Sequence, residues 1–429
     1  MSVDTIIIGG GFAGVTAARE LTLLGQNVVL LEARDRLGGR TWTTHLDDNQ
    51  IELGGAYVHH TQPFVWSEIQ RYGLHVENNI TVDHLKVIYF DGEKSEEIDG
   101  YAWTTEMMPI FQQYFENSLA AWPRPYDAKT NWDLLVSLDS RTALEYVDEM
   151  DLTPMQRITL ISYLESCAHN KIQNTSYVEM MRWYALSGHN LIALSESVGT
   201  YKTKEGTATL VNAIAADSNA EIKLSTKVVE VDDIGDRVSV TTEQGEKIKA
   251  DNLLLTVPIN VIDQINFNPP LQQQRIDAAL EKHSGAGFKV ILKVKGDYQG
   301  IWCACEMEHC PLNAVLAHEF DGENTIMIGF GYSEVPVNLK DYELMQTWMR
   351  NFISDIEIIK STGHSWAEDP MSLGTWCSYR PGQLQKYYDV LRQDQGHIYF
   401  AGSDLANGWR GFIDGAIESG IKAARRIVQ

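Results

Sequence analysis

The 429-residue sequence predicts an α/β fold built around a Rossmann-like domain that binds a dinucleotide. Two neighbouring patterns predict it. Residues 5–8 form an apolar run typical of a buried parallel strand, and the glycine-rich stretch "GGGFAG" at residues 9–14 follows directly. Residues 13–24 then carry apolar side chains at helical spacing. The chain is long enough for two domains, each with its own core.

The glycine-rich stretch is the predicted phosphate-binding turn. Gly9, Gly11 and Gly14 match the pattern G-x-G-x-x-G between a strand and a helix. The first glycine permits the tight turn, the second lets the backbone approach a pyrophosphate, and the third lets the helix pack closely on the strand. Ala13 begins the predicted helix, directly after Phe12, and the helix N-terminus would face the anion.

A second predicted strand, residues 27–31, ends at Glu32. A carboxylate at this place accepts hydrogen bonds from the adenosine ribose hydroxyls. It would also repel a 2′-phosphate, which argues against NADP even though Arg34 is near. The turn and Glu32 together do not distinguish NAD from FAD.

Five further blocks make that distinction. They are "EARDRLGGRTWT" (32–43), "IELGGAYVH" (51–59), "STKVVEVD" (225–232), "DNLLLTVP" (251–258) and "IYFAGSDLANGWRGFIDGAIESGIKAA" (398–424). In this order, over nearly the whole chain, they resemble the flavin amine oxidase superfamily, and most of all its monoamine oxidase-like branch with the bacterial amine and nicotine-type oxidases. The resemblance implies a Rossmann-like FAD-binding domain and an α+β substrate-binding domain, as in the amine oxidase/p-hydroxybenzoate hydroxylase-like fold.

The resemblance also implies which residues contact FAD besides the glycine turn. Val228 would meet the adenine through its backbone, and a helix over residues 413–428 would point its N-terminus at the flavin pyrimidine edge, where its dipole favours negative charge. The full set is Glu32, Ala33, Arg34, Gly38, Gly39, Arg40, Leu53, Gly54, Gly55, Ala56, Tyr57, Val228, Val257, Gly402, Ser403, Asp404, Gly411, Phe412, Ile413 and Ala416.

The order of the blocks predicts a discontinuous FAD-binding domain made of residues 1–75, 205–265 and 385–429. Residues 76–204 and 266–384 would then form the substrate-binding domain. The first of these insertions carries helical patterns, and the second includes the predicted strands "FKVILKVKG" (288–296) and "NTIMIGFGY" (324–332).

Lys289 is the first predicted catalytic residue. Its strand alternates apolar and lysine positions, so the pattern alone places the lysines on the polar face of a half-buried strand. In the amine oxidases a lysine at this place reaches a water near flavin N5. The resemblance therefore implies that Lys289 assists the reaction of reduced flavin with oxygen.

Two aromatic residues complete the predicted amine site. Monoamine oxidases carry a tyrosine pair that flanks the substrate above the flavin, and Trp376 and Phe412 stand at the matching positions. Aromatic residues are also common in cores, so packing stays an alternative. Tyr379 and Trp409 are expected to support the pair. Some relatives bond FAD to a cysteine just before the first aromatic, but Thr375 stands there, which predicts noncovalent FAD.

The implied reaction is oxidation of an amine to an imine, which hydrolyses to an aldehyde or ketone, with O₂ reduced to H₂O₂. An L-amino-acid oxidase is the main alternative. Relatives of that kind carry Met-Arg where Ala56-Tyr57 stands here, so Arg380 or Arg410 would have to bind the carboxylate. A polyamine oxidase with acidic cavity residues and a flavin-bound scaffold without turnover stay open.

Composition excludes other classes of function. The formal charge of −23 argues against nucleic-acid and anionic-membrane partners, which need clustered Lys and Arg. With no run of eighteen apolar residues, we expect a soluble cytoplasmic protein with a small-molecule amine substrate, and a homodimer as the working expectation.

His59 and His60 are expected to be structural. Cys303, Cys305 and Cys310 lack the paired spacing of zinc knuckles, so no metal site is predicted, and Cys377 is expected to be a packed thiol.

Overall fold

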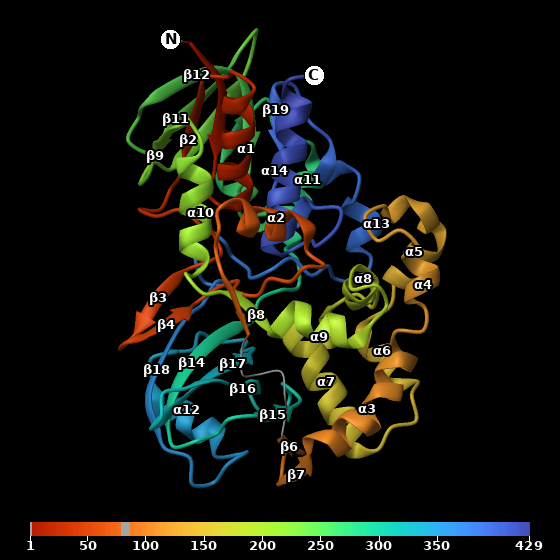
Figure 1. Cartoon of the computed structure of the whole chain (residues 1–429). Helices are drawn as coiled ribbons and strands as arrows, with labels where there is room; N and C mark the ends of the chain where they lie inside the picture. The colour runs from red at the N-terminus through yellow and green to blue at the C-terminus, as the bar shows by residue number, and fades with distance from the viewer. Residues whose placement is uncertain (1, 79–85) are drawn as a thin grey trace.

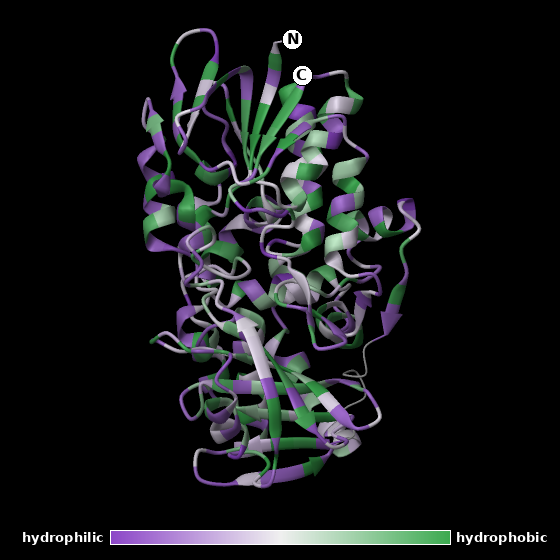
Figure 2. Ribbon diagram, turned by 90° about the vertical axis from the view of Figure 1, so that its left-hand side faces the viewer, coloured by the Kyte–Doolittle hydropathy of each residue, from purple (hydrophilic) through white to green (hydrophobic). Residues whose placement is uncertain are grey.

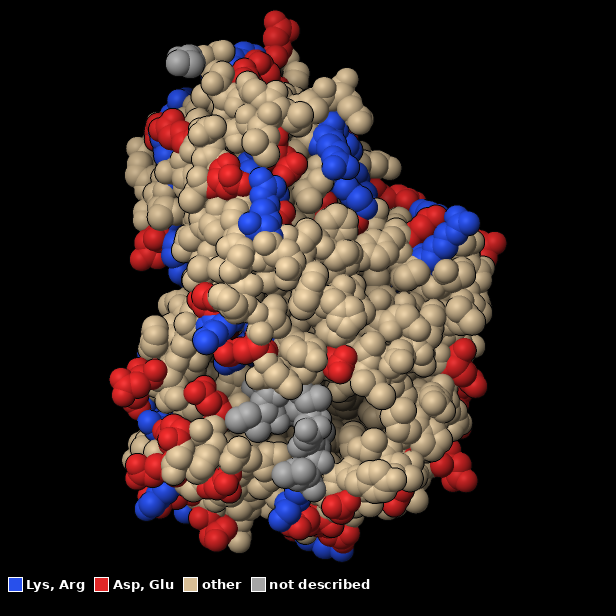
Figure 3. Space-filling model, in the orientation of Figure 1, with Lys and Arg blue, Asp and Glu red and all other residues tan. Residues whose placement is uncertain are grey.

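A computed structural model of the chain describes residues 2–78 and 86–429. Met1 and residues 79–85, which belong to the first predicted insertion, lie outside the described residues. The described strands form two large sheets, one near the two termini and one at the opposite end of the molecule (Figure 1). On the face that Figure 3 shows, acidic and basic side chains are interspersed, and the acidic ones are the more widespread. None of the helices among these residues is long and apolar enough to cross a membrane.

The larger sheet is organised around β1 (Val3–Ile8), which pairs in parallel with β2 (Val28–Leu31) and with β12 (Lys247–Leu255). Its central strands carry apolar residues on both faces because helices and loops cover both (Figure 2). The strand order is β13-β10-β11-β12-β1-β2-β9, and β19 also pairs with β12. The other strands are β9 (Glu221–Lys223), β10 (Val228–Asp233), β11 (Val238–Thr242), β13 (Asn266–Asn268) and β19 (Ile398–Phe400).

Two helices from opposite ends of the chain lie side by side against this sheet, α1 (Phe12–Leu23) and α14 (Ile413–Ile427) (Figure 1). A Cβ atom on Gly420 would lie 2.4 Å from the Ala13 carbonyl oxygen, so only glycine permits this approach. The packing brings the first and the last predicted flavin blocks together.

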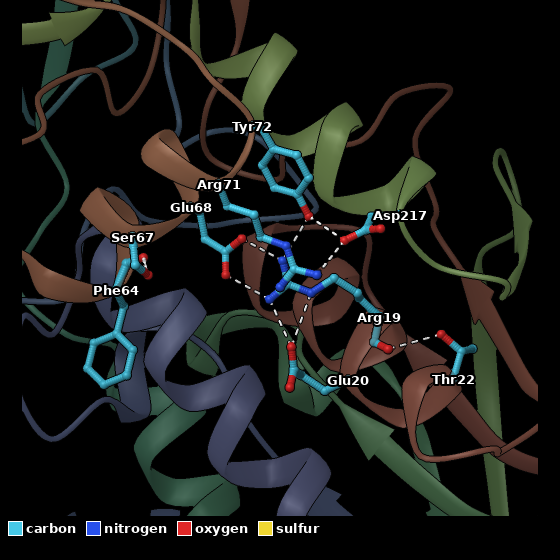
Figure 4. Close-up of polar contacts among 9 residues, drawn as sticks. All are labelled: Arg19, Glu20, Thr22, Phe64, Ser67, Glu68, Arg71, Tyr72 and Asp217. Carbon is cyan, nitrogen blue, oxygen red and sulfur yellow. Dashed lines mark hydrogen bonds and ion pairs between the residues drawn. The ribbon is translucent and has the colours of Figure 1, made fainter.

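A charge cluster around the buried Arg19 ties α1 to two neighbouring helices, α2 (Pro63–Arg71) and α10 (Thr207–Ala216) (Figure 4). Arg19 is 1% exposed and donates to Glu68 Oε1 at 2.7 Å and to Tyr72 Oη at 2.8 Å. Tyr72 in turn donates to Asp217 Oδ2 at 3.0 Å. Burial disfavours the charge of Arg19, but these acceptors raise its pKa above the ordinary value, so it stays protonated.

The second sheet has the order β18-β14-β17-β16-β15-β6-β7 and is antiparallel except for the β15–β6 pair. Its strand β14 (Phe288–Lys295) is covered on both faces at its start, so Lys289 is only 4% exposed and does not lie on a solvated face. The other strands are β6 (Lys86–Phe90), β7 (Ser95–Asp99), β15 (Ile301–Cys305), β16 (Leu312–Phe320), β17 (Asn324–Gly331) and β18 (Ile358–His364).

A helical layer packs beside the second sheet around an aromatic core that includes Trp122, Tyr177 and Trp183. Its helices are α3 (Gly100–Tyr114), α4 (Ser118–Ala121), α5 (Trp132–Asp139), α6 (Ala143–Asp148), α7 (Pro154–Ala168), α8 (Val178–Leu186) and α9 (Leu191–Gly199). Elsewhere lie α11 (Gln273–Glu281), α12 (Tyr342–Met349), α13 (Gln383–Tyr387) and the strand pairs β3 (Thr43–Leu46) with β4 (Asn49–Glu52) and β5 (Val76–Asn78) with β8 (Tyr201–Thr203).

The two large sheets draw on different stretches of the chain. Strands from residues 1–75, 205–265 and 385–429 supply most of the larger sheet, and those from 86–99 and 288–364 supply the second. One strand departs from the predicted division: β13 begins the second insertion yet pairs with β10 of the larger sheet.

Candidate active site

A cavity of about 1000 Å³ opens at the carboxyl ends of β1, β2 and β12 and extends to the second sheet and the helical layer. The carboxyl edge of a mostly parallel sheet is the usual place for a ligand in this class of fold. The cavity is therefore positioned to hold a nucleotide at one end and a second molecule at the other.

Most residues predicted from the sequence line this one cavity. Two do not, Gly14 and Asp404, and both lie directly behind the wall. The predicted residues that line it are Gly9, Gly11, Phe12, Ala13, Glu32, Ala33, Arg34, Gly38, Gly39, Arg40, Leu53, Gly54, Gly55, Ala56, Tyr57, Val228, Val257, Lys289, Trp376, Gly402, Ser403, Gly411, Phe412, Ile413 and Ala416.

The glycine turn has the geometry that its pattern predicts. Gly9 has a φ of 109°, and a Cβ on Gly14 would lie 1.9 Å from the Gly9 carbonyl oxygen, which forces glycine at both positions. Among the described residues, a Cβ on Gly11 would meet only Gly39, at 3.8 Å from its Cα and 4.0 Å from its nitrogen, so there is free space above Gly11. Among the described residues no side chain caps α1, which leaves its first amides for an anion in the cavity.

Glu32 is fixed against this turn. Its side chain is buried, with Oε2 accepting from the Gly10 amide at 2.5 Å and Oε1 accepting from the Arg34 amide at 2.8 Å. Two backbone donors hold the carboxylate in one orientation at the cavity wall. A preoriented carboxylate suits recognition of a ribose diol.

Arg40 joins three separate segments at the nucleotide side of the cavity. It donates to the Thr375 carbonyl oxygen at 2.5 Å, to Ser403 Oγ at 2.7 Å and to Asp404 Oδ1 at 2.5 Å. Asp404 is 2% exposed and also accepts from the Ile259 amide at 3.2 Å. Asp404 therefore acts through Arg40 and the chain around it rather than at the cavity surface.

Lys289 reaches the cavity from the first residues of β14. Its Nζ donates to the Gly54 carbonyl oxygen at 3.1 Å, within the second flavin block. Burial lowers the pKa of Lys289 to about 8, and nearby Lys202 lowers it further while Glu52 opposes the shift. A lysine with a pKa near neutrality in a cavity is a candidate for a chemical role.

Trp376 forms one aromatic wall. Its indole donates to the Cys167 carbonyl oxygen at 2.7 Å, and its ring stacks on His169 with centroids 4.3 Å apart and planes 2° apart. His169 Nε2 lies 2.9 Å from the Phe288 carbonyl oxygen. Burial lowers the pKa of His169 to about 4, so this histidine is neutral at pH 7 and Trp376 stacks on an uncharged ring.

Phe412 forms the second wall, at the N-cap of α14. Trp183 and Trp409 both meet it edge-on, with centroid distances of 4.8 Å and 5.0 Å. Trp409 is fully buried and donates to the Thr61 carbonyl oxygen at 2.9 Å. Phe412 is only partly buried, so its remaining surface faces the cavity.

Sequence reasoning missed most of the far end of the cavity. These residues come from α3, α7, α9 and the second sheet: Tyr101, Trp103, Met107, Phe111, Tyr163, His169, Ile192, Glu196, Trp302 and Phe330. Trp103, Met107 and Phe111 recur every four residues, which is a visible stripe in the sequence. Such a stripe is typical of any helix that packs on a core, so it could not single out a cavity.

The remaining candidates lie away from the cavity surface. His59 is buried, lies 2.9 Å from Thr61 Oγ1 and forms a contact with Glu196 at 3.3 Å. Tyr379 lies under Arg410, 3.7 Å from ring centroid to guanidinium carbon. Cys377 is buried and burial raises its thiol pKa. Within residues 2–78 and 86–429 no group of histidine, cysteine and acidic side chains has the arrangement of a metal site.

Residues 12–428 match the sequence model of a protein family that is described as "Flavin containing amine oxidoreductase". The chain is a member of this family. It is 37% identical to a pseudooxynicotine dehydrogenase from a Pseudomonas species, over 97% of this chain and 84% of that protein. It is also 33% identical to a nicotine dehydrogenase from Pseudomonas putida, over 99% of this chain and 88% of that protein.

The chain is also similar to a mammalian amine oxidase. A bovine flavin-containing amine oxidase B is 29% identical over 99% of this chain and 86% of its own length. Among solved structures, putrescine oxidase bound to putrescine superposes with a TM-score of 0.84 over 100% of this chain and 99% of that one, at 19% identity. Cyclohexylamine oxidase from Brevibacterium oxydans superposes with a TM-score of 0.82 at the same identity and coverage. These two likenesses show the fold.

The amine oxidase family membership identifies the cofactor as FAD, and the cavity fits it. The free space above Gly11, the uncapped α1 N-terminus and the oriented Glu32 provide a place for pyrophosphate and ribose. The α14 N-terminus also has no side-chain cap among the described residues and faces the opposite part of the cavity. Thr375 lines the wall beside Trp376 whereas Cys377 is buried outside the described lining, in keeping with noncovalent binding.

Proposed function

We propose that this flavin enzyme oxidises an amine that carries an aromatic ring to an imine, which water hydrolyses to an aldehyde or ketone, with O₂ reduced to H₂O₂. The observation that carries the proposal is that Trp376, Phe412 and Lys289 line the same cavity as the nucleotide-binding turn. Bound FAD supplies the two-electron acceptor for the hydride that leaves the α-carbon of the amine.

The walls of the cavity prepare the amine. Trp376 and Phe412 offer apolar surface, and an apolar site lowers the pKa of an alkylammonium from its usual value of roughly 10, so the neutral amine binds. The nitrogen lone pair is then free to form the C=N bond. No separate carboxylate or histidine base is needed once the proton has been lost.

The aromatic lining supports a ring-bearing substrate. The far end of the cavity presents Trp103, Phe111, Tyr163, Trp302 and Phe330. Flat rings pack well against such surfaces. The names of two relatives contain nicotine and pseudooxynicotine, and nicotine joins an aromatic ring to an amine-bearing carbon. This chemistry agrees with a heteroaromatic amine.

The cavity gives less support to an amino acid as substrate. Among the described lining residues the arginines are Arg34 and Arg40, both on the nucleotide side, and Arg40 is already bonded to Thr375, Ser403 and Asp404. Arg410 pairs with Glu179 behind the wall. A substrate carboxylate near Trp376 would therefore lack a guanidinium partner.

Oxygen is the proposed acceptor because Lys289 places a donor beside Gly54, within the second flavin block. Relatives bear names of both kinds, oxidase and dehydrogenase, so the acceptor needs its own measurement. Reduced enzyme should be mixed with O₂ and, separately, with a one-electron dye. Reoxidation by O₂ within the time of one turnover supports the oxidase, and reoxidation by the dye alone overturns it.

Anaerobic titration tests the reaction itself. The purified protein should be yellow, and acid precipitation should release its FAD into the supernatant. Addition of nicotine or a benzylamine should bleach the flavin absorbance, whereas L-amino acids and putrescine should leave it unchanged. Bleaching by amino acids alone would establish the alternative oxidase, and no bleaching by any amine would support a flavin-bound scaffold.

A further inference from the structure

One helix of the helical layer directs three side chains at the loop that precedes α14. On α8 these are Glu179, Arg182 and Trp183, at spacing i, i+3 and i+4. Residues three and four apart lie on one side of a helix. The loop is residues 408–412, and its last two residues, Gly411 and Phe412, line the cavity. We call this set of contacts the α8 clamp.

Arg182 is the centre of the α8 clamp. It is 1% exposed and donates to the Gly408 carbonyl oxygen at 3.0 Å and to the Arg410 carbonyl oxygen at 3.3 Å. Buried carbonyl groups need donors, and a guanidinium fork satisfies two at once in a fixed geometry. The backbone on both sides of Trp409 is therefore held by one side chain.

The flanking contacts secure the side chains of the loop. Glu179 pairs with Arg410, and both residues are 1% exposed. Trp183 meets Phe412 edge-on at a centroid distance of 4.8 Å. The clamp thus reaches from the buried end of the loop to the aromatic wall itself.

The loop contains a position that favours glycine and that links it to the flavin segment. Gly411 has a φ of 88°, and a Cβ at that position would lie 3.2 Å from the Cys377 nitrogen. The Gly411 amide donates to the Ser403 carbonyl oxygen at 3.0 Å, which links the loop to the flavin segment at residues 402–403. A shift of the loop would move a cofactor-facing segment and the Phe412 ring together.

We propose that Glu179, Arg182 and Trp183 are positioning residues that fix Phe412 and the adjoining backbone against the flavin and the amine. The part that concerns the amine rests on the proposed function, and the part that concerns the flavin does not. This role differs from a general contribution to stability, because the three side chains hold the 408–412 loop in place rather than the helical layer to which they belong.

Arg182→Met tests the proposal in the full FAD-bound enzyme. Methionine keeps much of the buried volume, and the Glu179–Arg410 pair stays intact. The visible absorption spectrum of bound FAD should shift, since the loop faces the cofactor. KM for the amine should rise about tenfold and anaerobic reduction should slow, while reoxidation stays close to that of the parent enzyme.

Arg19→Met is the control, because Arg19 is equally buried and is also held by hydrogen bonds, but it bonds Glu68 and Tyr72 of the α2 region and not the 408–412 loop (Figure 4). It should lower the melting temperature and leave the flavin spectrum and KM unchanged. If Arg182→Met does not fold, Glu179→Gln takes its place and should change the flavin spectrum and KM in the same direction but less. Arg182→Lys should give a spectrum and a KM between those of Arg182→Met and the parent enzyme.

The outcomes separate the two claims. If Arg182→Met shifts the flavin spectrum but the parent enzyme turns over no amine, the positioning role stays and the proposed function is wrong. A flavin spectrum and KM that are unaltered in Arg182→Met, or altered equally in Arg19→Met, overturn the positioning role.

Discussion

The two ends of the cavity are built from different parts of the polypeptide. The nucleotide end uses backbone: Gly9, Gly11, Gly38 and Gly39 bring main-chain atoms to the surface, and the α1 N-terminus, which no side chain caps among the described residues, faces inward. The amine end uses side chains, chiefly aromatic rings from α3, α8 and the second sheet. Backbone recognition suits a cofactor that does not vary, whereas side chains can be exchanged to admit a different amine.

The largest expected effect breaks the nucleotide end alone. In Gly11→Val the new side chain has room within the described part of the protein, because a Cβ there meets only Gly39, at 3.8 Å or more, and Gly11 has an ordinary φ of −75°. It would, however, occupy the space for the pyrophosphate. The purified variant should fold with a parent-like circular dichroism spectrum yet contain no FAD, as absorbance and fluorescence titration will show.

Gly199→Ala is the control for that variant. Apart from its own helix, a Cβ on Gly199 meets no atom of the described residues within 4 Å, and this residue lines the amine end. The control should retain FAD in full. If Gly11→Val retained FAD as well, the glycine turn would not be the site of the pyrophosphate.

The same contrast explains how far the sequence could predict the molecule. The nucleotide end depends on consecutive residues with strict requirements, so Gly9, Gly14 and Glu32 were identifiable from spacing alone. Lys289 was not, because an alternating strand predicts a solvated lysine and only the family resemblance singled it out. Its burial results from the second flavin block, where Gly54 accepts its hydrogen bond, more than two hundred residues earlier in the chain.

The amine end was the harder part for a related reason. Trp302 and Phe330 lie on strands of the second sheet, and Trp103 lies on a helix that packs beside them. Each of these rings looks like a core residue in its own segment. They form a cavity wall only because three distant segments pack together, and the residue pattern within one segment does not predict that packing.

The second prediction breaks the amine end and leaves the nucleotide end intact. Trp376→Ala or Phe412→Ala should slow anaerobic flavin reduction by about 100-fold, because hydride transfer tolerates misplacement of only about 1 Å. FAD content and the rate of reoxidation should be nearly those of the parent. Stopped-flow measurement of both half-reactions decides, and an equal loss in each would mean that these rings only pack the core.

The third prediction concerns Lys289, which lies where the two ends meet. Lys289→Met should slow reoxidation by O₂ about tenfold, a barrier change of about 1.4 kcal/mol, with less effect on reduction. Because the pKa of Lys289 is about 8 rather than its ordinary 10.5, the side chain loses its proton as the pH rises through 8. Reoxidation of the parent should therefore decline above pH 8, and that of the variant should stay flat. A parent-like pH profile in Lys289→Met would assign the step to another group.

The smallest expected effect sharpens the account of the nucleotide end. In the parent enzyme both carboxylate oxygens of Glu32 accept from backbone N–H groups. The glutamine side chain of Glu32→Gln keeps one oxygen and places an NH₂ group at the position of the other. The ribose also loses a charge-assisted acceptor, worth about 1.5–3 kcal/mol at most. FAD affinity should fall about tenfold, near the lower limit of that range, because the remaining oxygen still accepts.

Glu68→Gln is the matched control: it removes an equally buried carboxylate from Arg19, so it should lower the melting temperature without changing FAD affinity. Fluorescence titration of the apoprotein with FAD measures both, and an unchanged affinity in Glu32→Gln would leave Glu32 as a support for the turn rather than a ligand of the ribose.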